Sequence, residues 1–257
     1  MRRGRLTRTL AVALGAALLV SLAGAPGEAS AGKRKKAIGV DVSRFQGDID
    51  WPTVRKSGIR FAFIQASRGT GADCDVVPDN CGPDLYYESN YAEARAAKIR
   101  VGAYHRVFID PEPFEALKAD ARLEAETFAS MVGTLRRGDL LPALDVESPF
   151  DGASPVQIRV WIKTWIKRVR KLLGSKPIIY TNTTSWAATG NTLKFAAKGY
   201  PLWVANWSVK NPSVPAGNWA RRGWAVWQYT SSGRVPGISG RVDMNRIRVR
   251  FRKITAR

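Results

Sequence analysis

Two carboxylates one residue apart, Asp145 and Glu147, close an apolar run that begins at Leu140. Successive side chains of a strand point to opposite faces, so residues i and i+2 share a face and these two acids would project side by side. Like charges at this spacing push one pKa up and the other down, which yields a proton donor and an anion from two similar groups. The alternative is a strand that ends at the surface with two solvated acids.

A carboxylate pair of this kind suits the hydrolysis of a glycosidic bond. One acid protonates the leaving oxygen, and the second supports positive charge at the anomeric carbon or activates water. The β-carbons would lie roughly 6 to 7 Å apart, a spacing that does not choose between retention and inversion. A serine triad would need His105, the single histidine, but the sequence holds no G-x-S-x-G turn. We expect His105 to be a structural hydrogen-bonding residue.

The elements that must position these acids alternate along the chain. Segments with helical periodicity separate the early apolar runs, and the helix-like ranges are 51–57, 87–98, 113–132, 155–173 and 193–198. Apolar, β-branched runs predict eight strands, at 38–45, 61–66, 100–108, 140–147, 177–181, 201–207, 224–230 and 242–247.

This alternation predicts an α/β fold with parallel strands and right-handed crossovers. Eight strands fill a closed barrel with their own side chains, so we expect a modified TIM-like (β/α) barrel whose last strands lack full helices. The alternative is an open doubly wound sheet, but Asp41 to Gly47 stands after the first strand in place of a Gly-rich phosphate loop.

In a closed barrel, Asp145 and Glu147 would lie near two further acids. The first and last strands lie side by side, so Asp41 and Asp243 would face each other at the mouth that holds Asp145 and Glu147. Four carboxylates could instead hold calcium or magnesium, but the twelve-residue calcium loop is absent. We therefore expect no metal and no cofactor.

Residues 1–31 are predicted to be a signal peptide, with early arginines, a short apolar stretch and a cleavage site at Ala29-Ser30-Ala31. Residues 32–257 are then a single catalytic domain, exported and without a membrane span. In an oxidising compartment, Cys74 and Cys81 should form a local disulfide, whereas a zinc site would lack ligands.

The chain is strongly basic, with a net charge of +20. Removal of residues 1–31, which carry four arginines and one glutamate, would leave +17. Such a charge attracts anionic wall polymers, anionic membrane surfaces or nucleic acid, of which export makes nucleic acid the least expected; a surface made basic for solubility is the alternative. Nine tryptophans and seven tyrosines supply faces that stack on sugars or fill a core. By parity, Tyr180 with Asn182 and Trp203 with Ala205 should point inward near the mouth.

Ordered segments of the chain resemble one known family, the family 25 glycoside hydrolases, or Chalaropsis-type lysozymes. The similarity runs from about Ile38 to Ile247. One departure is Arg106, which stands where the family commonly has an aromatic residue. The segments that carry the resemblance are Gly39-Val40-Asp41-Val42-Ser43, Gly102-Ala103-Tyr104-His105, Leu144-Asp145-Val146-Glu147, Ile179-Tyr180-Thr181-Asn182, Leu202-Trp203-Val204-Ala205, Trp227-Gln228-Tyr229 and Val242-Asp243-Met244-Asn245.

The resemblance implies an incomplete β/α barrel and a secreted N-acetylmuramidase that cuts the β-1,4 bond between N-acetylmuramic acid and N-acetylglucosamine in peptidoglycan. It makes Glu147 the general acid and Asp145 the partner carboxylate, which either attacks or stabilises an intermediate formed by the acetamido group. It makes Asp41 and Asp243 the flanking acids. The sugar groove would be lined by Tyr104, Tyr180 and Trp203.

Two other function classes follow from the same residues. The chain could be a wall-carbohydrate-binding protein that kept the groove and lost catalysis, although all four acids are present. A secreted nucleic-acid-binding protein would need basic residues interleaved with aromatics on one face, whereas the basic residues here are spread over helices and the tail. We expect a monomer that acts on peptidoglycan and is also drawn to anionic wall polymers.

Overall fold

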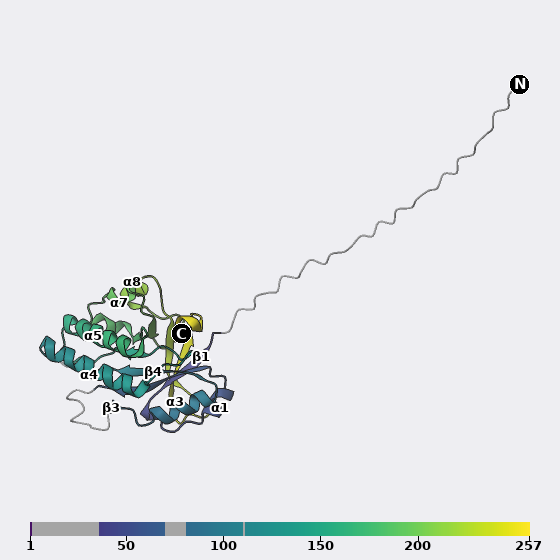
Figure 1. Ribbon diagram of the computed structural model, residues 1–257, viewed down its shortest axis with the longest axis horizontal. Coiled ribbons are helices and arrows are strands. Elements are labelled where there is room, and N and C mark those ends of the chain that lie inside the picture. The colour runs from purple at the N-terminus through teal and green to yellow at the C-terminus, as the bar shows by residue number, and fades with distance from the viewer. Residues whose placement is uncertain (2–35, 70–80, 110) are drawn as a thin grey trace. The chain divides into compact units, whose positions relative to one another are not determined.

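The structure is a computed structural model that describes residues 1, 36–69, 81–109 and 111–257. Except for Met1, the predicted signal peptide 1–31 lies outside the described residues. Cys74 also lies outside them, so the disulfide between Cys74 and Cys81 stays a prediction. The elements below all belong to the unit Lys36–Arg257 (Figure 1).

Eight strands close into a barrel. The strand order is β1-β9-β8-β7-β6-β5-β4-β2, and β1 pairs with β2 to complete the ring. The two-residue strand β3 (Gly82–Pro83) adds to β2 outside the ring. The predicted barrel and its eight strands are confirmed. The barrel strands are β1 (Ile38–Val42), β2 (Phe61–Arg68), β4 (Arg100–Arg106), β5 (Ala143–Asp145), β6 (Ile178–Thr181), β7 (Leu202–Ala205), β8 (Val226–Gly233) and β9 (Val242–Ile247).

The expectation that all barrel strands are parallel is wrong for β9. This strand runs antiparallel to both β1 and β8. A parallel connection needs a crossover of a dozen or more residues, whereas residues 234–241 between β8 and β9 form a short loop. The chain therefore turns back on itself as a hairpin, and the start of β9 lies at the same mouth as the carboxyl ends of the parallel strands.

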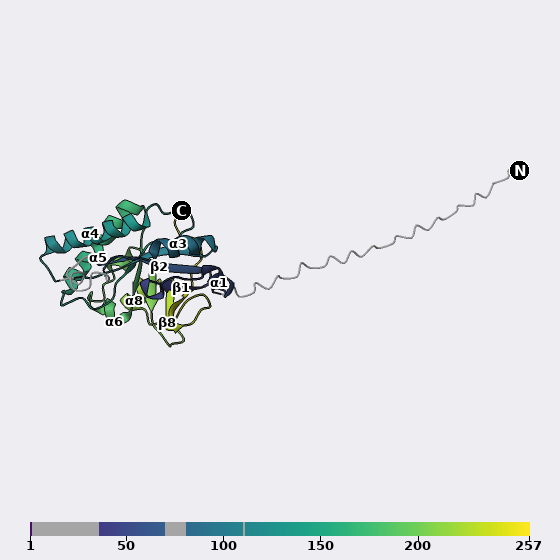
Figure 2. The same ribbon diagram turned by 90° about the horizontal axis from the view of Figure 1, so that it is seen from below.

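The helices surround the barrel unevenly. The two longest helices, α4 and α5, pack against each other along one flank (Figure 1), and Figure 2 shows α6 and α8 on the opposite side from α3. The later connections hold only short helices, as predicted. The helices are α1 (Trp51–Lys56), α3 (Tyr87–Ala96), α4 (Phe114–Val132), α5 (Pro155–Leu173), α6 (Thr183–Ala187), α7 (Lys194–Ala197) and α8 (Pro215–Ala220), with 3-10 turns η1 (Arg44–Gln46) and η3 (Phe251–Lys253).

Local sequence signals explain where α5 begins and ends. Ser154 Oγ accepts a hydrogen bond from the Gln157 backbone, and Gln157 Oε1 accepts one from the Ser154 backbone, which together form a capping box. Pro155 follows at the first helical position. Gly174 ends the helix in the left-handed region at φ 67°, which costs glycine little. The apolar stripe of α5 then faces the barrel.

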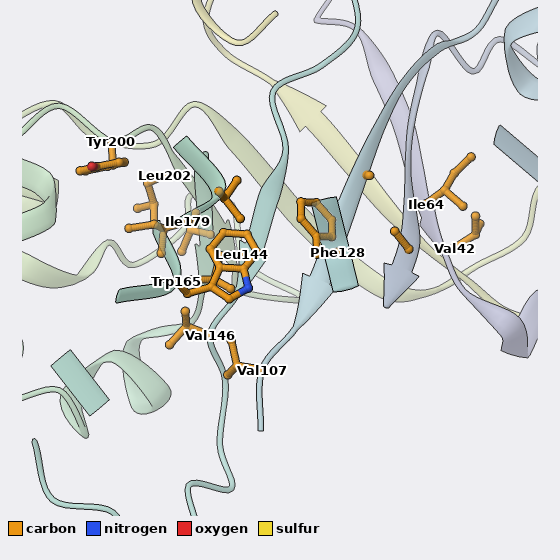
Figure 3. Close-up of a cluster of buried hydrophobic side chains, with 14 of the residues drawn as sticks. Val42, Ile64, Val107, Phe128, Leu144, Val146, Trp165, Ile179, Tyr200 and Leu202 are labelled. Carbon is orange, nitrogen blue, oxygen red and sulfur yellow. The ribbon is translucent and has the colours of Figure 1, made fainter. Parts of the chain in front are cut away.

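The core has two layers. One layer lies between the barrel and its helices and includes Leu144, Trp165 and Ile179, which Figure 3 shows packed together. The second layer fills the inside of the barrel and includes Phe61, Phe63 and Trp203, with the Phe63 and Trp203 rings stacked 4.4 Å apart. The interior is therefore packed, and open space is confined to the mouth.

Three buried polar side chains connect strand β2, strand β4 and helix α4, namely Ser67, His105 and Glu124. The side chains of His105 and Glu124 are fully buried, with Ser67 Oγ 2.8 Å from His105 Nδ1 and Glu124 Oε2 2.5 Å from Nε2. Burial, and to a lesser degree the charge of Arg106, lowers the pKa of His105 to about 3. This serine, histidine and glutamate resemble a hydrolytic triad, but no solvent reaches them. The structural role predicted for His105 is confirmed.

Closure of the barrel depends on a glycine in β1. A β-carbon on Gly39 would lie 2.6 Å from Phe61 Cδ1. Because both strands are held by the ring, we expect Gly39→Ala to lower the free energy of unfolding by about 2 kcal/mol, as measured by urea denaturation. The neighbouring Ile38 side chain is exposed, so Ile38→Thr should change it by no more than about 0.5 kcal/mol. Equal midpoints for the two variants would contradict this account.

Candidate active site

The mouth of the barrel holds a cavity of about 190 Å³. All four predicted acids and all three predicted aromatic residues line it. The lining residues are Asp41, Ser43, Phe45, Gln65, Arg68, Tyr104, Arg106, Asp145, Glu147, Tyr180, Trp203, Gln228 and Asp243.

Asp41 and Asp243 form one half of the site. They are register partners across the β1–β9 pair, as predicted from barrel closure. Gln228 Nε2 donates to both oxygens of Asp41, at 3.0 and 3.1 Å, and lies 3.3 Å from Asp243 Oδ2. Asn245 donates to Asp41 Oδ2 at 2.6 Å. The two carboxyl groups are therefore held together by shared donors.

Two carboxyl groups this close share a proton. Burial and the charge of Asp243 raise the pKa of Asp41 well above its usual range, against the hydrogen bonds from Asn245 and Gln228. Burial raises the pKa of Asp243 to about 6, and its hydrogen bond with Asp41 acts in the opposite direction. The pair is best described as one proton held by Asp41 beside an Asp243 carboxylate above pH 6.

Asp145 and Glu147 form the other half, on either side of a guanidinium. Arg106 Nε lies 3.8 Å from Asp145 Oδ2 and 3.4 Å from Glu147 Oε1. Arg106 Nη1 also donates to the Glu147 carbonyl at 2.7 Å, and Nη2 donates to the Ser148 carbonyl at 3.3 Å. The arginine therefore fixes both the backbone after β5 and the two acid side chains.

The two acids sit in different environments. The Asp145 side chain is 9% exposed and that of Glu147 is 32% exposed. Burial, followed by the charge of Glu147, raises the pKa of Asp145 well above its usual range, and Arg106 acts in the opposite direction. The site thus offers one buried and one accessible carboxyl group.

The expectation that one strand carries both acids is wrong in part. Strand β5 ends at Asp145, and Glu147 lies beyond it. The neighbouring strands end at Arg106 and Thr181, so strand pairing on both sides stops before residue 147. Arg106, rather than continued strand geometry, keeps Glu147 beside Asp145.

The predicted aromatic residues form the floor of the cavity. Tyr104, Tyr180 and Trp203 are 9%, 6% and 1% exposed, so they pack mainly as core and offer little ring surface to the cavity. Trp203 Nε1 donates to Asn245 Oδ1 at 2.7 Å, and Tyr180 donates to Gln228 Oε1 at 3.0 Å. They therefore orient the residues that hold Asp41.

The prediction from strand parity that Asn182 points inward near the mouth is wrong. Its Oδ1 accepts from the Ser185 backbone at 2.8 Å and caps α6. Strand β6 has already ended at Thr181, so strand parity no longer applies to residue 182. Ala205 is buried with the inner core layer, as expected.

Sequence reasoning missed several residues of the site. Gln228 connects Asp41, Asp243, Tyr180 and Trp207. Its signal in the sequence was an amide between the aromatic residues Trp227 and Tyr229. The exposed aromatic rings near the acids are Phe45, 75% exposed, and Trp207, 49% exposed, rather than those on the floor.

A metal site and a membrane-spanning helix each have requirements that the described residues do not meet. Among the described residues, no group of three histidine, cysteine, aspartate or glutamate side chains is arranged to hold a metal ion. Within the same residues, no helix is long and apolar enough to cross a membrane.

A closed barrel with paired carboxyl groups at its mouth, one buried and one accessible, defines a glycosidase type of site. Comparison with known proteins agrees with that class. Residues 40–238 match the model of glycosyl hydrolases family 25, and the chain belongs to this family. The resemblance found in the sequence is therefore confirmed.

Individual relatives fit the same family. The chain is 37% identical to Lysozyme M1 of Streptomyces globisporus over 81% of its own length and 66% of the relative, slightly less than two thirds. The bacterial lysozyme of Streptomyces coelicolor aligns with a TM-score of 0.70 and 34% identity, over 84% of this chain and 94% of that one. A muramidase from Trichobolus zukalii aligns with a TM-score of 0.67 and 26% identity, over 83% and 94%.

The shared proton makes a prediction about stability. Native Asp243 takes up its proton near pH 6, whereas an ordinary aspartate does so near 3.8. Between these values the native state binds more protons than the unfolded state, so this group destabilises the protein above pH 6 and ceases to do so near pH 4. We expect Asp243→Asn to raise stability by about 1 kcal/mol at pH 7.5 and by less at pH 4.

Thermal unfolding of both proteins from pH 4 to 8 measures this difference. Asp48→Asn, which removes an exposed carboxyl group, is the control and should keep the pH trend of the wild type. A gain for Asp243→Asn that grows toward pH 4 would show that the sign is wrong.

Proposed function

We propose that this chain is a secreted peptidoglycan hydrolase that cleaves the β-1,4 bond between N-acetylmuramic acid and N-acetylglucosamine. The observation that carries the proposal is the convergence of Asp145 and Glu147 on Arg106, opposite the Asp41 and Asp243 pair, in one cavity. Support comes from family membership and from relatives named lysozyme and muramidase.

The exposure of the two acids suggests their roles. A general acid must reach the leaving oxygen, and Glu147 is the more accessible of the pair. Asp145 lies deeper, and its Oδ1 accepts no hydrogen bond from the described residues. An oxygen without a hydrogen-bond partner suits the group that supports charge at the anomeric carbon, by attack or by stabilising an acetamido-derived intermediate, when Asp145 is ionised, which is the form that the charge of Arg106 favours against burial.

The remaining residues would position the sugar. Asp41 and Asp243, with Gln228, present one negative charge and one proton at the far wall. Tyr104, Tyr180 and Trp203 would support the sugar from below, while Phe45 and Trp207 offer open ring faces at the rim.

The proposal includes export and attraction to the wall. Residues 1–31 supply the predicted signal peptide, and the described residues carry a basic face on α5 and α7. The two cavities there combine apolar side chains with five exposed lysines that make no ion pair within the described part of the chain. We define this basic face as Lys163, Lys167, Lys171, Lys194 and Lys198. It would attract anionic wall polymers.

Glu147→Gln tests the catalytic proposal. The amide keeps the size of the side chain but cannot donate the proton, so clearing of a bacterial wall suspension should fall by about 100-fold or more while wall binding is retained. Glu93→Gln, in the exposed surface of α3, is the control and should clear the suspension like the wild type.

Mass analysis of the reducing ends released from purified peptidoglycan identifies the bond. Muramic acid ends support the proposal, and glucosamine ends would mean a different glycosidase. A wild type that binds walls without releasing any ends would instead be a binding protein without catalysis.

The basic face makes a separate prediction. Replacing Lys163, Lys167 and Lys171 by glutamine should weaken wall binding at low salt by about tenfold, and the difference should vanish near 1 M salt because exposed charges are then screened. Lys56, Lys98 and Lys253 replaced by glutamine give the same net charge and should bind more like the wild type. Equal weakening by both triple variants would contradict a localised face.

A further inference from the structure

Two arginines lie side by side at the mouth of the barrel. Arg68 is the last residue of β2, Arg106 is the last residue of β4, and the two are register partners. Both line the cavity that holds the four acids. Like charges directly opposite each other on neighbouring strands are destabilising, so this pair calls for an explanation.

The charge of Arg106 is already compensated, whereas Arg68 has no ion-pair partner among the described residues. Arg106 lies within 4 Å of two carboxylates and donates to backbone carbonyls. In the described part of the chain, Arg68 makes no ion pair and no hydrogen bond, and its Nε is buried without a partner. Its observed contact is with the ring of Phe108, whose centroid is 5.0 Å away.

A third arginine adds to the surplus of positive charge. Arg44 begins η1, its side chain is 13% exposed, and its Nε and Nη2 are buried without a hydrogen-bond partner. Its Nε lies 3.9 Å from Asp84, at the edge of an ion pair. Burial, followed by the charges of Arg44 and Arg106, lowers the pKa of Arg68. The charge of Asp145 acts on this pKa in the opposite direction, but within the described residues no carboxylate lies at ion-pair distance from the Arg68 side chain.

Packing keeps the Arg68 guanidinium in place. The Phe108 ring lies under both guanidinium groups, 5.0 Å from Arg68 and 5.4 Å from Arg106. Gly69 makes room for this ring, because a β-carbon there would lie 2.7 Å from Phe108 Cδ2. A planar guanidinium that is held on a ring and has free donors suits a carboxylate, which it can bind through two parallel hydrogen bonds.

We propose that Arg68, flanked by Arg106 and Arg44, forms an anion-binding subsite of the cleft. This subsite binds a carboxylate on the 3-substituent of the muramyl unit. The inference rests on the proposed function. N-acetylglucosamine units carry no such group, so the subsite would determine which sugar of an alternating strand lies on each side of Glu147. Arg106 touches both the subsite and the acids, and so connects anion binding to the position of the scissile bond.

Matched soluble oligosaccharides test this inference. One carries the free lactyl carboxylate, a second carries it as a neutral methylamide, and a third carries an alanyl-glutamate dipeptide. We expect the wild type to cleave one of the two anionic substrates with a kcat/KM about tenfold or more above that of the methylamide. The favoured anionic substrate tells whether the carboxylate belongs to the sugar or to the peptide stem.

Arg68→Met should lose this preference, so that its kcat/KM for the anionic substrates and for the methylamide become equal. Arg122→Met, in the exposed surface of α4, removes one arginine far from the subsite and should keep the preference. A preference that is absent from the wild type, or equal in the wild type and Arg68→Met, would overturn the inference.

Thermal unfolding separates this inference from the proposed function, because it requires no turnover. N-acetylmuramic acid, but not N-acetylglucosamine, should raise the melting temperature of the wild type and leave that of Arg68→Met unchanged. Arg68→Met without ligand should melt at or above the wild-type temperature, since it removes an uncompensated charge. A shift by inorganic phosphate as large as that by N-acetylmuramic acid would identify a free-phosphate site and overturn the inference. Failure to release muramic acid ends from any substrate would instead refute the proposed function.

Discussion

The burial of like-charged carboxyl groups beside one another is the constraint on which this structure depends. Asp41 and Asp145 are almost fully buried, each next to a second acid, and isolated charges in such surroundings would be strongly unfavourable. The protein offsets this cost in two ways. Gln228 and Asn245 donate hydrogen bonds to Asp41, and Arg106 places a positive charge between Asp145 and Glu147. The donors are themselves fixed by Tyr180 and Trp203, so the floor of the barrel and the acids form one network.

The directions of the strands bring the residues of this network together at the mouth. Residues that meet at the mouth must come from the carboxyl ends of parallel strands, with one exception. Strand β9 runs in the opposite direction, so its first residues reach the same mouth and Asp243 becomes the partner of Asp41. The packed interior, with Phe63 stacked on Trp203, gives these strands no freedom to slide. Charged groups that repel each other are thus kept at fixed positions by the packed core beneath them.

Acidic and basic side chains occupy different parts of the mouth of the barrel. Acids from β1, from β9 and from the end of β5 line one part of it, while arginines end β2 and β4. The acidic part is balanced within the protein, by shared protons and by Arg106. Among the described residues the Arg68 side chain has no ion-pair partner, and a folded protein that tolerates such a charge in its cleft gives up stability there. Catalytic acids and an anion subsite would then share Arg106, so that substrate position and acid geometry depend on one side chain.

The sequence by itself determined the repeating elements and the identity of the acids, because hydrophobic periodicity and i, i+2 spacing are local properties. The eight strands, the long helices and the convergence of Asp41, Asp145, Glu147 and Asp243 followed from it. Only the tertiary structure decided the reversed direction of β9, the end of β5 before Glu147, and the capping role of Asn182. It also decided that Gln228 links both halves of the wall and that Arg68 lies beside Arg106. These depend on which strands become neighbours, and pairing between residues far apart in sequence leaves no local pattern.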